Sequence, residues 1–554
     1  MLKKKFFCTT ITISLVFGTI FTPNHTFFLR TPKVLAETTD DAFTINKEGV
    51  LTSYQGTASE LQIPDTVRSI AANAFANQNN LTTITMQGSL NKIETNAFSN
   101  CQNLKEFKCD GYISNIETLA FSNCPNLTTL EFDSVGEIAD NMVAGNQNNI
   151  TIYSHLNTSL STYAKNNNMA YTVVVDNSKK MSIQEALDSG EKNILLKGDF
   201  PVLGYLWLPK TSDVTVTATD ATFIGQLCIL SGHNKNFTWN GGTFVGDGQK
   251  RISFSLLRLE NATFKNLTFS NAVPFGKHVF DLLGCKGVKI LNCTFIGYGT
   301  STKCSDPHSR YAEAIQLDHA TVDASGYSTH QDYSYIMQQF LTYFGYSDTQ
   351  NMNAGIKEIF NGQTTKQVTI KDCLFTCYTD SAGNLISYAQ SPVGQHTYSK
   401  KDQNCNISFV NNEVINPIPL KESTDSYNGA LHFVSIKGLT IKNNIFRSTV
   451  SRETWIQLLN RQNSTNATGS SNQLPSSNIK ISNNKFYGKQ PSRCFIELAS
   501  CVPKDAHYKF SKVRITNNKY MATKKVKLKP FIKTTGGATQ FSFTSKSGNG
   551  LRKY

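Results

Sequence analysis

Charged residues are scarce in this chain of 554 residues. They make up 17% of it, against 39% hydrophobic residues, which excludes a disordered polyelectrolyte and a polytopic membrane protein. Proline is also sparse, with 15 residues, whereas glycine and phenylalanine each number 35 and tyrosine numbers 21. This composition, rich also in Asn, Thr and Ser, favours strands and turns over long helices. At this length two or more domains are expected.

Acidic residues are absent after Asp505, so much of the net charge of +14 lies at the C-terminal end of the chain. Five basic residues and no acidic one lie in residues 1–36, and eleven basic residues lie in 511–554, which leaves 37–510 at about −2. We therefore do not expect residues 37–510, the main part of the chain, to bind nucleic acid. A cationic C-terminal segment is expected instead, either simply solvated or in contact with an anionic cell-wall polymer.

Long apolar runs are missing beyond the N-terminal region, so no membrane span is expected in the mature chain. Lys3–Lys5 precede an apolar stretch from Phe6 to Phe21, and Val34–Ala36 supply small or apolar residues before Glu37. This is the order of regions in a secretory signal. We expect residues 1–36 to be a signal peptide and the mature protein to be secreted or held at the cell surface.

Cys-x-x-Cys pairs and Cys/His spacings of the zinc type are missing as well, although the chain has 13 cysteines. In an exported chain this number would normally indicate disulfides. However, Cys101 and Cys124 occupy the same place in consecutive repeats, as do Cys293 and Cys373. Cysteines in repeat register are usually small buried residues, so we expect ladders of thiols. No metal site is predicted, and the cofactor stays unknown.

A period of 23 residues runs through about 42–175. Asn73 to Leu81 (NAFANQNNL) returns as Asn96 to Leu104 (NAFSNCQNL) and as Leu119 to Leu127 (LAFSNCPNL). One such unit cannot bury its apolar face alone, so the units must stack into a short solenoid. The motif resembles the BspA-type leucine-rich repeats of surface proteins. The resemblance implies a recognition module for a host or cell-surface protein, and residues 150–175 are expected to close it.

A looser repeat follows from about residue 181, with the form apolar-x-apolar-x-Asn-x-x-aromatic. Val288 to Phe295 is its clearest copy, and Val368 to Phe375 matches it. Alternation at period two predicts strands, and Asn at a fixed offset suits a left-handed corner between them. With a second short strand upstream of each copy, the pattern predicts a right-handed parallel β-helix over 181–525 and resembles the pectin-lyase-like superfamily.

The predicted fold class is therefore mainly β, a short leucine-rich-repeat solenoid followed by a right-handed parallel β-helix. The β-helix is expected to carry an insertion at 319–366, and a basic tail is expected at 526–554. The insertion is rich in Tyr and Phe, and Ser334–Phe344 has helical spacing. We expect most of these aromatic side chains to dock a helix on the β-helix flank and the remainder to stack on sugar rings.

Polar side chains gather on one side of the predicted coils. Aligning the coils places Asp281, Gln316 and His432 in one outward column, with His278 and Glu313 two residues before an inward residue. Because neighbouring coils are about 4.8 Å apart, these groups are expected in one patch. The candidate catalytic residues are His278, Asp281, Glu313, Gln316, Asp318 and His396, and the candidate substrate-binding residues are His432, Tyr333 and Tyr343.

Two reactions on a polysaccharide could use such a patch. Glu313 with Asp318 or Asp281 would suit a glycoside hydrolase, whereas His278 or His396 would suit the base of a uronate lyase. The Asn-Thr-Asp and Arg-x-Pro-x-x-Arg signatures of pectinases are missing, which disfavours pectin itself. The structural alternative is that Glu313 and His278 are only hydrogen-bonded strand-end residues.

Two functional hypotheses follow. In the first, a secreted or cell-surface protein uses its leucine-rich repeats to bind a partner, and its β-helix binds and cleaves a polysaccharide or cell-surface glycan. In the second, the chain is a non-enzymatic surface adhesin that uses both solenoids for binding. Convergence in a cleft would favour the first hypothesis, and scattering would favour the second, for five residues: His278, Asp281, Glu313, Asp318 and His396.

Overall fold

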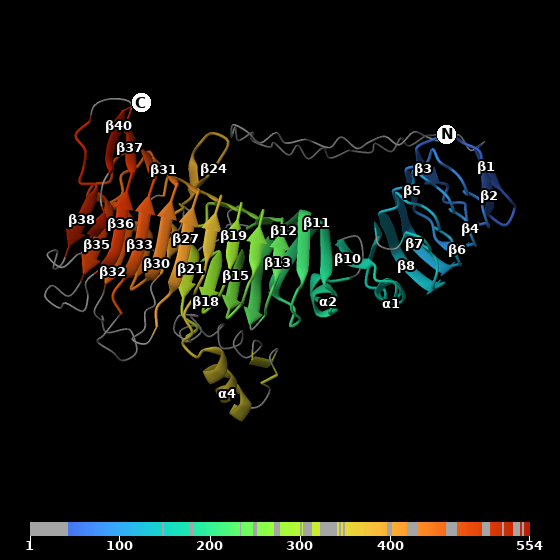
Figure 1. Cartoon of the computed structure of the whole chain (residues 1–554), viewed down its shortest axis with the longest axis horizontal. Helices are drawn as coiled ribbons and strands as arrows, with labels where there is room; N and C mark the ends of the chain where they lie inside the picture. The colour runs from blue at the N-terminus through green and yellow to red at the C-terminus, as the bar shows by residue number, and fades with distance from the viewer. Residues whose placement is uncertain are drawn as a thin grey trace, which may run out of the picture.

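The computed structural model describes residues 42–146, 149–176, 181–232, 234–246, 252–270, 278–299, 302, 313–321, 341–342, 345–346, 349–395, 402–417, 429–460, 474–500, 510–522, 526–535, 543–545 and 548–553. Figure 1 shows an elongated stack of strands with the leucine-rich repeats at one end and the β-helix along the rest. Nearly all described strands belong to one 38-stranded sheet, while β24 (Tyr378–Thr379) and β25 (Leu385–Ser387) form a separate pair.

The N-terminal solenoid repeats every 23 residues, as the sequence predicts. Its first two strands are antiparallel, and each later strand pairs in parallel with its equivalent in the next repeat, so that Glu60, Thr83, Glu106 and Thr129 align. Its strands are β1 (Phe43–Ile45), β2 (Val50–Tyr54), β3 (Glu60–Ile63), β4 (Ser69–Ile70), β5 (Thr83–Met86), β6 (Leu90–Ile93), β7 (Glu106–Ile116), β8 (Thr129–Ile138) and β9 (Thr151–Ser154).

Side-chain ladders hold these repeats together. The rings of Phe75, Phe98 and Phe121 stack with centroids 5.0 and 4.9 Å apart. Cys101 and Cys124 are buried beside them, and their thiols donate to the carbonyl oxygens of Phe75 and Phe98 at 3.1 Å. The ten cysteines within the described residues are all free. The predicted thiol ladder is therefore present at these positions.

The segment predicted to close the first solenoid instead joins it to the second. After α1 (Thr158–Asn166), β10 (Ala170–Asp176) pairs in parallel with β9 on one side and with β11 (Asn193–Trp207) on the other. Val173, Val174 and Val175 are all buried, as expected of a parallel strand covered on both faces. The short helix α2 (Ile183–Asp188), which begins with a capping box between Ser182 and Glu185, packs on β11.

Three parallel sheets form the β-helix, and β12 (Thr215–Gly232) runs through all three. The first sheet continues with β15 (Ile252–Leu257), β18 (Phe280–Leu283), β21 (Glu313–Asp318), β26 (Ser391–Gly394), β29 (Gly429–Val434), β32 (Thr454–Asn460), β35 (Cys494–Ser500) and β38 (Ile532–Thr535). The second has β13 (Thr238–Asn240), β16 (Thr263–Lys265), β19 (Lys289–Leu291), β22 (Thr369–Lys371), β27 (Cys405–Val410), β30 (Lys437–Lys442), β33 (Ser477–Ser482), β36 (Ser511–Thr516) and β39 (Phe543–Ser545). The third has β14 (Thr243–Val245), β17 (Thr268–Ser270), β20 (Thr294–Ile296), β23 (Leu374–Thr376), β28 (Glu413–Ile415), β31 (Ile445–Ser448), β34 (Lys485–Gly488), β37 (Lys519–Ala522) and β40 (Gly550–Lys553).

The corners of the coils explain the recurring asparagine. Asn292, Asp372 and Asn443 adopt φ values of 51°, 56° and 58°, the left-handed conformation that Asn and Asp tolerate best after glycine. The residues that come directly after the corners form a second column. Cys293 and Cys373 occupy it in the earlier coils, and a ladder of buried amides occupies it in the later ones: Asn412, Asn444, Asn484 and Asn518. The predicted fold class, a leucine-rich-repeat solenoid followed by a right-handed parallel β-helix, is confirmed.

The insertion and the basic C-terminal segment both attach to the β-helix. In the insertion, α4 (Thr349–Ile359) ends at an apolar cluster in which Ile359 and Phe360 pack with Leu257 and Leu283, and the helix expected at Ser334–Phe344 lies almost wholly outside the described residues. At the C-terminus, β38, β39 and β40 pair with β35, β36 and β37. The segment expected as a tail therefore adds a last coil.

Candidate functional site

The predicted polar column exists on the first sheet of the β-helix. Strand register places Asp281 beside Gln316, Gln316 beside Gly394, and Gly394 beside His432. The column continues through Gln457 to Glu497. Sequence alignment of the coils therefore found the column, but it missed the coil that contains Gly394.

Glu313 joins two histidines from different coils. Its Oε2 lies 3.0 Å from His278 Nδ1, and its Oε1 lies 3.0 Å from His432 Nε2. Glu313 and His432 have no exposed surface, whereas the His278 side chain is 18% exposed. The three residues thus form one network whose outer end is His278.

Gly394 makes room for this network. A Cβ atom at this position would lie 2.3 Å from Glu313 Oε1 and 2.5 Å from His432 Nε2. Such distances do not occur in real structures, so any larger residue would displace the carboxylate or the imidazole. Gly394 belongs to the Gly-Gln-His segment at 394–396, but nothing in its sequence context indicates this packing role.

The remaining candidate carboxylates are buried rather than presented. Asp281 is 5% exposed and Asp318 has no exposed surface, and the amide of Gln316 donates to the carboxylate of Asp318. The sequence predicts that these groups face outward, and the strand register agrees. The described part of the insertion, however, packs beside them: Ala320, two residues after Asp318, exchanges backbone hydrogen bonds with Gln363 and Gly362.

Three predicted residues cannot be placed. His396, Tyr333 and Tyr343 lie outside the described residues, so their roles stay predictions. His432, predicted to bind substrate, lies inside the protein in contact with Glu313.

Burial dominates the electrostatics around the network. Desolvation lowers the pKa of His319, which follows Asp318, to about 4. Burial also raises the pKa of Tyr298, a fully buried residue that interacts electrostatically with Arg452 and Glu313. Arg452 is buried too, and its Nη1 donates to the carbonyl oxygens of Gln390 and Pro417 at 2.6 and 2.8 Å. Sequence reasoning missed Tyr298 and Arg452, because neither lies in a recurring motif.

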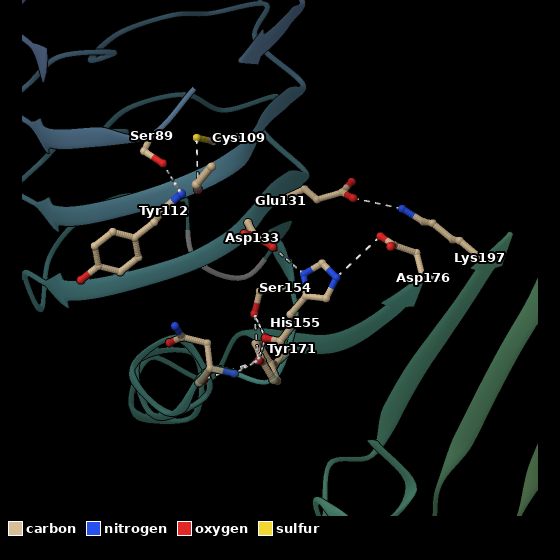
Figure 2. Close-up of polar contacts among 12 residues, drawn as sticks. Ser89, Cys109, Tyr112, Glu131, Asp133, Ser154, His155, Tyr171, Asp176 and Lys197 are labelled. Atoms are coloured by element: carbon tan, nitrogen blue, oxygen red, sulfur yellow. Dashed lines mark hydrogen bonds and ion pairs between the residues drawn. The ribbon is translucent and has the colours of Figure 1, made fainter. Parts of the chain in front are cut away.

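A second polar cluster lies where the two solenoids meet. Figure 2 shows His155 between Asp133 and Asp176, with Nδ1 2.9 Å from the first carboxylate and Nε2 3.6 Å from the second. Lys197 on β11 reaches back to Glu131 on β8 at 3.0 Å. These contacts tie β8 of the leucine-rich repeats to the first strands that follow. No motif in the sequence indicates them, since they depend on strand register across the junction.

Within the described residues, no group of three or more His, Cys, Asp or Glu side chains is arranged to hold a metal ion. In the same residues, no helix combines the length and apolar character needed to cross a membrane.

Comparison with known proteins identifies the first solenoid. The family of the BspA type leucine rich repeat region matches residues 53–171 in six copies, so these residues are a BspA-type leucine-rich repeat region. No curated protein matches the chain.

Among solved structures, the chain is similar to the Streptococcus pneumoniae surface protein and adhesin PfbA, at 15% identity over 67% of this chain and 95% of that chain, with a TM-score of 0.40. A second structure of PfbA, described as a surface adhesin of Streptococcus pneumoniae, matches at 14% identity over 61% and 80%, with a TM-score of 0.39.

Proposed function

We propose that this chain is a cell-surface recognition protein that uses its two solenoids to bind a polysaccharide or cell-surface glycan. One observation carries the proposal: β9, β10, β11 and β12 pair in parallel without interruption, so the leucine-rich repeats and the β-helix form one continuous stack. Stacked repeats present extended surfaces, and extended surfaces suit long or repetitive ligands. The contacts of His155 with Asp133 and the ion pair of Lys197 with Glu131 reinforce the junction.

Burial of the candidate carboxylates supports binding over hydrolysis. A glycoside hydrolase needs two carboxyl groups that flank the scissile bond and touch it. Glu313 and Asp318 have no exposed surface, and Asp281 is nearly buried. A carboxylate without accessible surface cannot contact a sugar. The alternative in which this network stabilises the fold fits these observations better than catalysis by Glu313.

The last coil offers a means of retention at an anionic surface. Six basic side chains are exposed on or near it: Lys512, Arg514, Lys527, Lys529, Lys533 and Arg552. No acidic residue follows Asp505, so nothing after that point offsets their charge. Clustered charge of one sign attracts a polyanion, which supports contact with an anionic cell-wall polymer.

A glycan panel tests this proposal directly. The mature chain is incubated with neutral and acidic polysaccharides, and both binding and the release of reducing ends are measured. We expect saturable binding to at least one glycan and no reducing ends above the protein-free control. Absence of binding to every glycan and to cell surfaces would contradict the recognition function.

A second candidate function, elimination at a uronate, rests on one contact. His278 Nδ1 lies 3.0 Å from the buried carboxylate of Glu313, and the His278 side chain keeps some exposed surface. A buried carboxylate fixes the tautomer of an imidazole and leaves Nε2 to accept a proton, as in a general base. His278, rather than Glu313, would then remove the proton from the sugar.

Absorbance of unsaturated uronates distinguishes this candidate. If elimination occurs, His278→Asn should abolish it, and Glu313→Gln should reduce it strongly by releasing the imidazole. Full turnover in the Glu313→Gln variant would exclude the dyad. If wild-type protein produces no unsaturated uronate from any acidic glycan, the lyase function is excluded.

A further inference from the structure

A groove on the leucine-rich repeats lies far in sequence from the polar column and the Glu313 network of the β-helix. It has a volume of about 390 Å³ and follows the turns between repeats. Its lining is uncharged: Asn73, Ala76, Asn77, Asn96, Ser99, Asn100, Leu119, Ser122, Asn123, Ala144 and Gly145. Five of these eleven residues are asparagines.

The asparagines form rows because the turns are stacked. The backbone N–H of Asn77 donates to the Ser99 carbonyl at 2.9 Å, and that of Asn100 donates to the Ser122 carbonyl at 3.0 Å. Asn123 continues the row with a bond to Ala144 at 3.2 Å. Successive turns are therefore in register, and the same amide group recurs at the spacing between strands, about 4.8 Å.

The amides that line the groove are not used to hold the repeats together. Within the described part of the chain, the side chains of Asn77, Asn100 and Asn123 make no hydrogen bond, and they are exposed or half-buried. Asparagines a few residues further along behave differently: Asn103 and Asn126 each donate to a backbone carbonyl of the preceding repeat. The same residue type thus has two roles in one motif.

Backbone conformation gives a structural reason for asparagine at these positions. Asn77, Asn100 and Asn123 have φ values of 63°, 59° and 54°, which Asn tolerates better than most residues. That conformation does not require asparagine, since Leu119 takes the position of Asn73 and Asn96 at φ 58°. Conformation favours asparagine at these positions, as at the corners of the β-helix, but it makes no use of the side-chain amides of Asn77, Asn100 and Asn123.

We infer that this groove binds a neutral polysaccharide. Each amide offers two donors and an acceptor, which matches sugar hydroxyl groups, and no charged side chain lines the groove to favour an acidic glycan. An extended peptide fits less well, because the turn N–H groups of Asn77, Asn100 and Asn123 are already bonded to the next repeat. The inference rests on the proposed recognition function and assigns a ligand class to the leucine-rich repeats.

Glycine substitution tests the side-chain amides separately from the left-handed backbone conformation. Asn77→Gly, Asn100→Gly and Asn123→Gly keep the left-handed backbone without strain and remove only the side chain. Each lost hydrogen bond should weaken binding about threefold to tenfold, so the triple variant should lose at least about tenfold. Asn100→Asp, which keeps the size but exchanges donors for charge, should weaken binding as well. Asn168→Gly is the matched control, since Asn168 is exposed at φ 53° and lies outside the groove.

The probes are neutral gluco-, manno- and galacto-oligosaccharides, with oligogalacturonate and hyaluronan as acidic counterparts. Calorimetric titration of the protein should detect binding of a neutral probe that falls in the triple variant and not in Asn168→Gly, while the melting temperature falls no more per substitution in the triple variant than in Asn168→Gly. Binding that survives the triple variant, or binding of acidic probes alone, would overturn the groove assignment and leave the recognition function standing. Failure to bind any glycan or cell surface would contradict both the groove assignment and the recognition function.

Discussion

At the scale of single residues, the candidate site depends on one glycine, Gly394, which has no Cβ atom. Gly394 separates Gln316 from His432 in the column, and its missing Cβ lets Glu313 reach across to His432. The backbone of Gly394 is not left-handed, so the requirement is for space rather than for conformation.

Gly394→Ala tests this requirement. The added Cβ would collide with Glu313 and His432, and we expect a loss of about 1–3 kcal/mol in the free energy of unfolding. Urea unfolding monitored by circular dichroism measures it. Gly88→Ala is the control, because there the nearest atom would be 3.4 Å away, an ordinary contact. Equal stability of the two variants would show that the network can relax at no cost.

The buried His319 makes stability depend on pH. Burial lowers its pKa to about 4 in the folded chain from 6.5, so the unfolded chain takes up the proton first. The stability is therefore present above pH 6.5 and is lost as the pH falls through 4. We expect a loss of about 2 kcal/mol between pH 7 and pH 4.5.

Urea unfolding of wild type and His319→Asn across this range checks the prediction. The variant cannot titrate at this position, so its stability should fall less on acidification. Parallel pH profiles for the two proteins would mean that other groups cause the acid sensitivity.

At the scale of elements, a buried amide ladder fixes the register of the later coils. The side chain of Asn444 donates to the Phe409 carbonyl and to Asn484 Oδ1, both at 2.9 Å, and accepts from the Asn412 backbone N–H at 2.8 Å. Each amide thus bonds to the coils on both sides. A slip of one residue would leave several buried polar groups without partners, which the fold disfavours strongly.

Asn444→Ala should therefore be costly. It removes the partner of a buried N–H group, and we expect a loss of about 3 kcal/mol in the free energy of unfolding. Asn443→Gly is the control: it keeps the corner at φ 58° and removes only an exposed hydrogen bond to Asn411. Thermal and urea unfolding should rank the variants in that order, and the reverse order would contradict the ladder's role.

At the scale of the whole molecule, the junction decides whether two solenoids act as one surface. Lys197 lies beside Asp176 in the strand register and reaches Glu131 at 3.0 Å. Its side chain is 37% exposed, so the ion pair adds only a small stabilisation, and strand pairing carries most of the connection.

Lys197→Glu should loosen the junction by placing a third carboxylate between Glu131 and Asp176. We expect cleavage within 177–185 by a broad-specificity protease to become several-fold faster, because proteolysis follows the population of the open state. Lys192→Glu serves as the control, since the side chain of Lys192 bonds to the Ser212 carbonyl, away from Glu131 and Asp176. Unchanged cleavage in Lys197→Glu would show that the strand pairing alone holds the junction.

The basic last coil predicts a salt-dependent interaction. Replacing Lys527, Lys529 and Lys533 with Gln should weaken binding of the protein to an anionic cell-wall polymer, while binding to neutral glycans stays unchanged. Elution at increasing salt measures the effect, since screening weakens exposed charge pairs. Elution of variant and wild type at the same salt concentration would show that the last coil does not bind the polymer.

The sequence by itself determined the two solenoids, because each is built from a local pattern that repeats. Stacking requires each turn to place the same residue types at the same offset, and this periodicity is visible in Asn73, Asn96 and the aligned cysteines. For the same reason, coil alignment predicted that Asp281, Gln316 and His432 share a column.

Only the tertiary structure decided what these residues do. Burial of Glu313, its contact with His432 beside Gly394 and the ion pair of Lys197 with Glu131 depend on contacts between coils whose separation in sequence follows no fixed period. The insertion and the extra coil at β26 interrupt the rhythm, so the partners across them cannot be counted from the sequence. Accessibility, which separates a catalytic carboxylate from a structural one, is a property of the packed molecule alone.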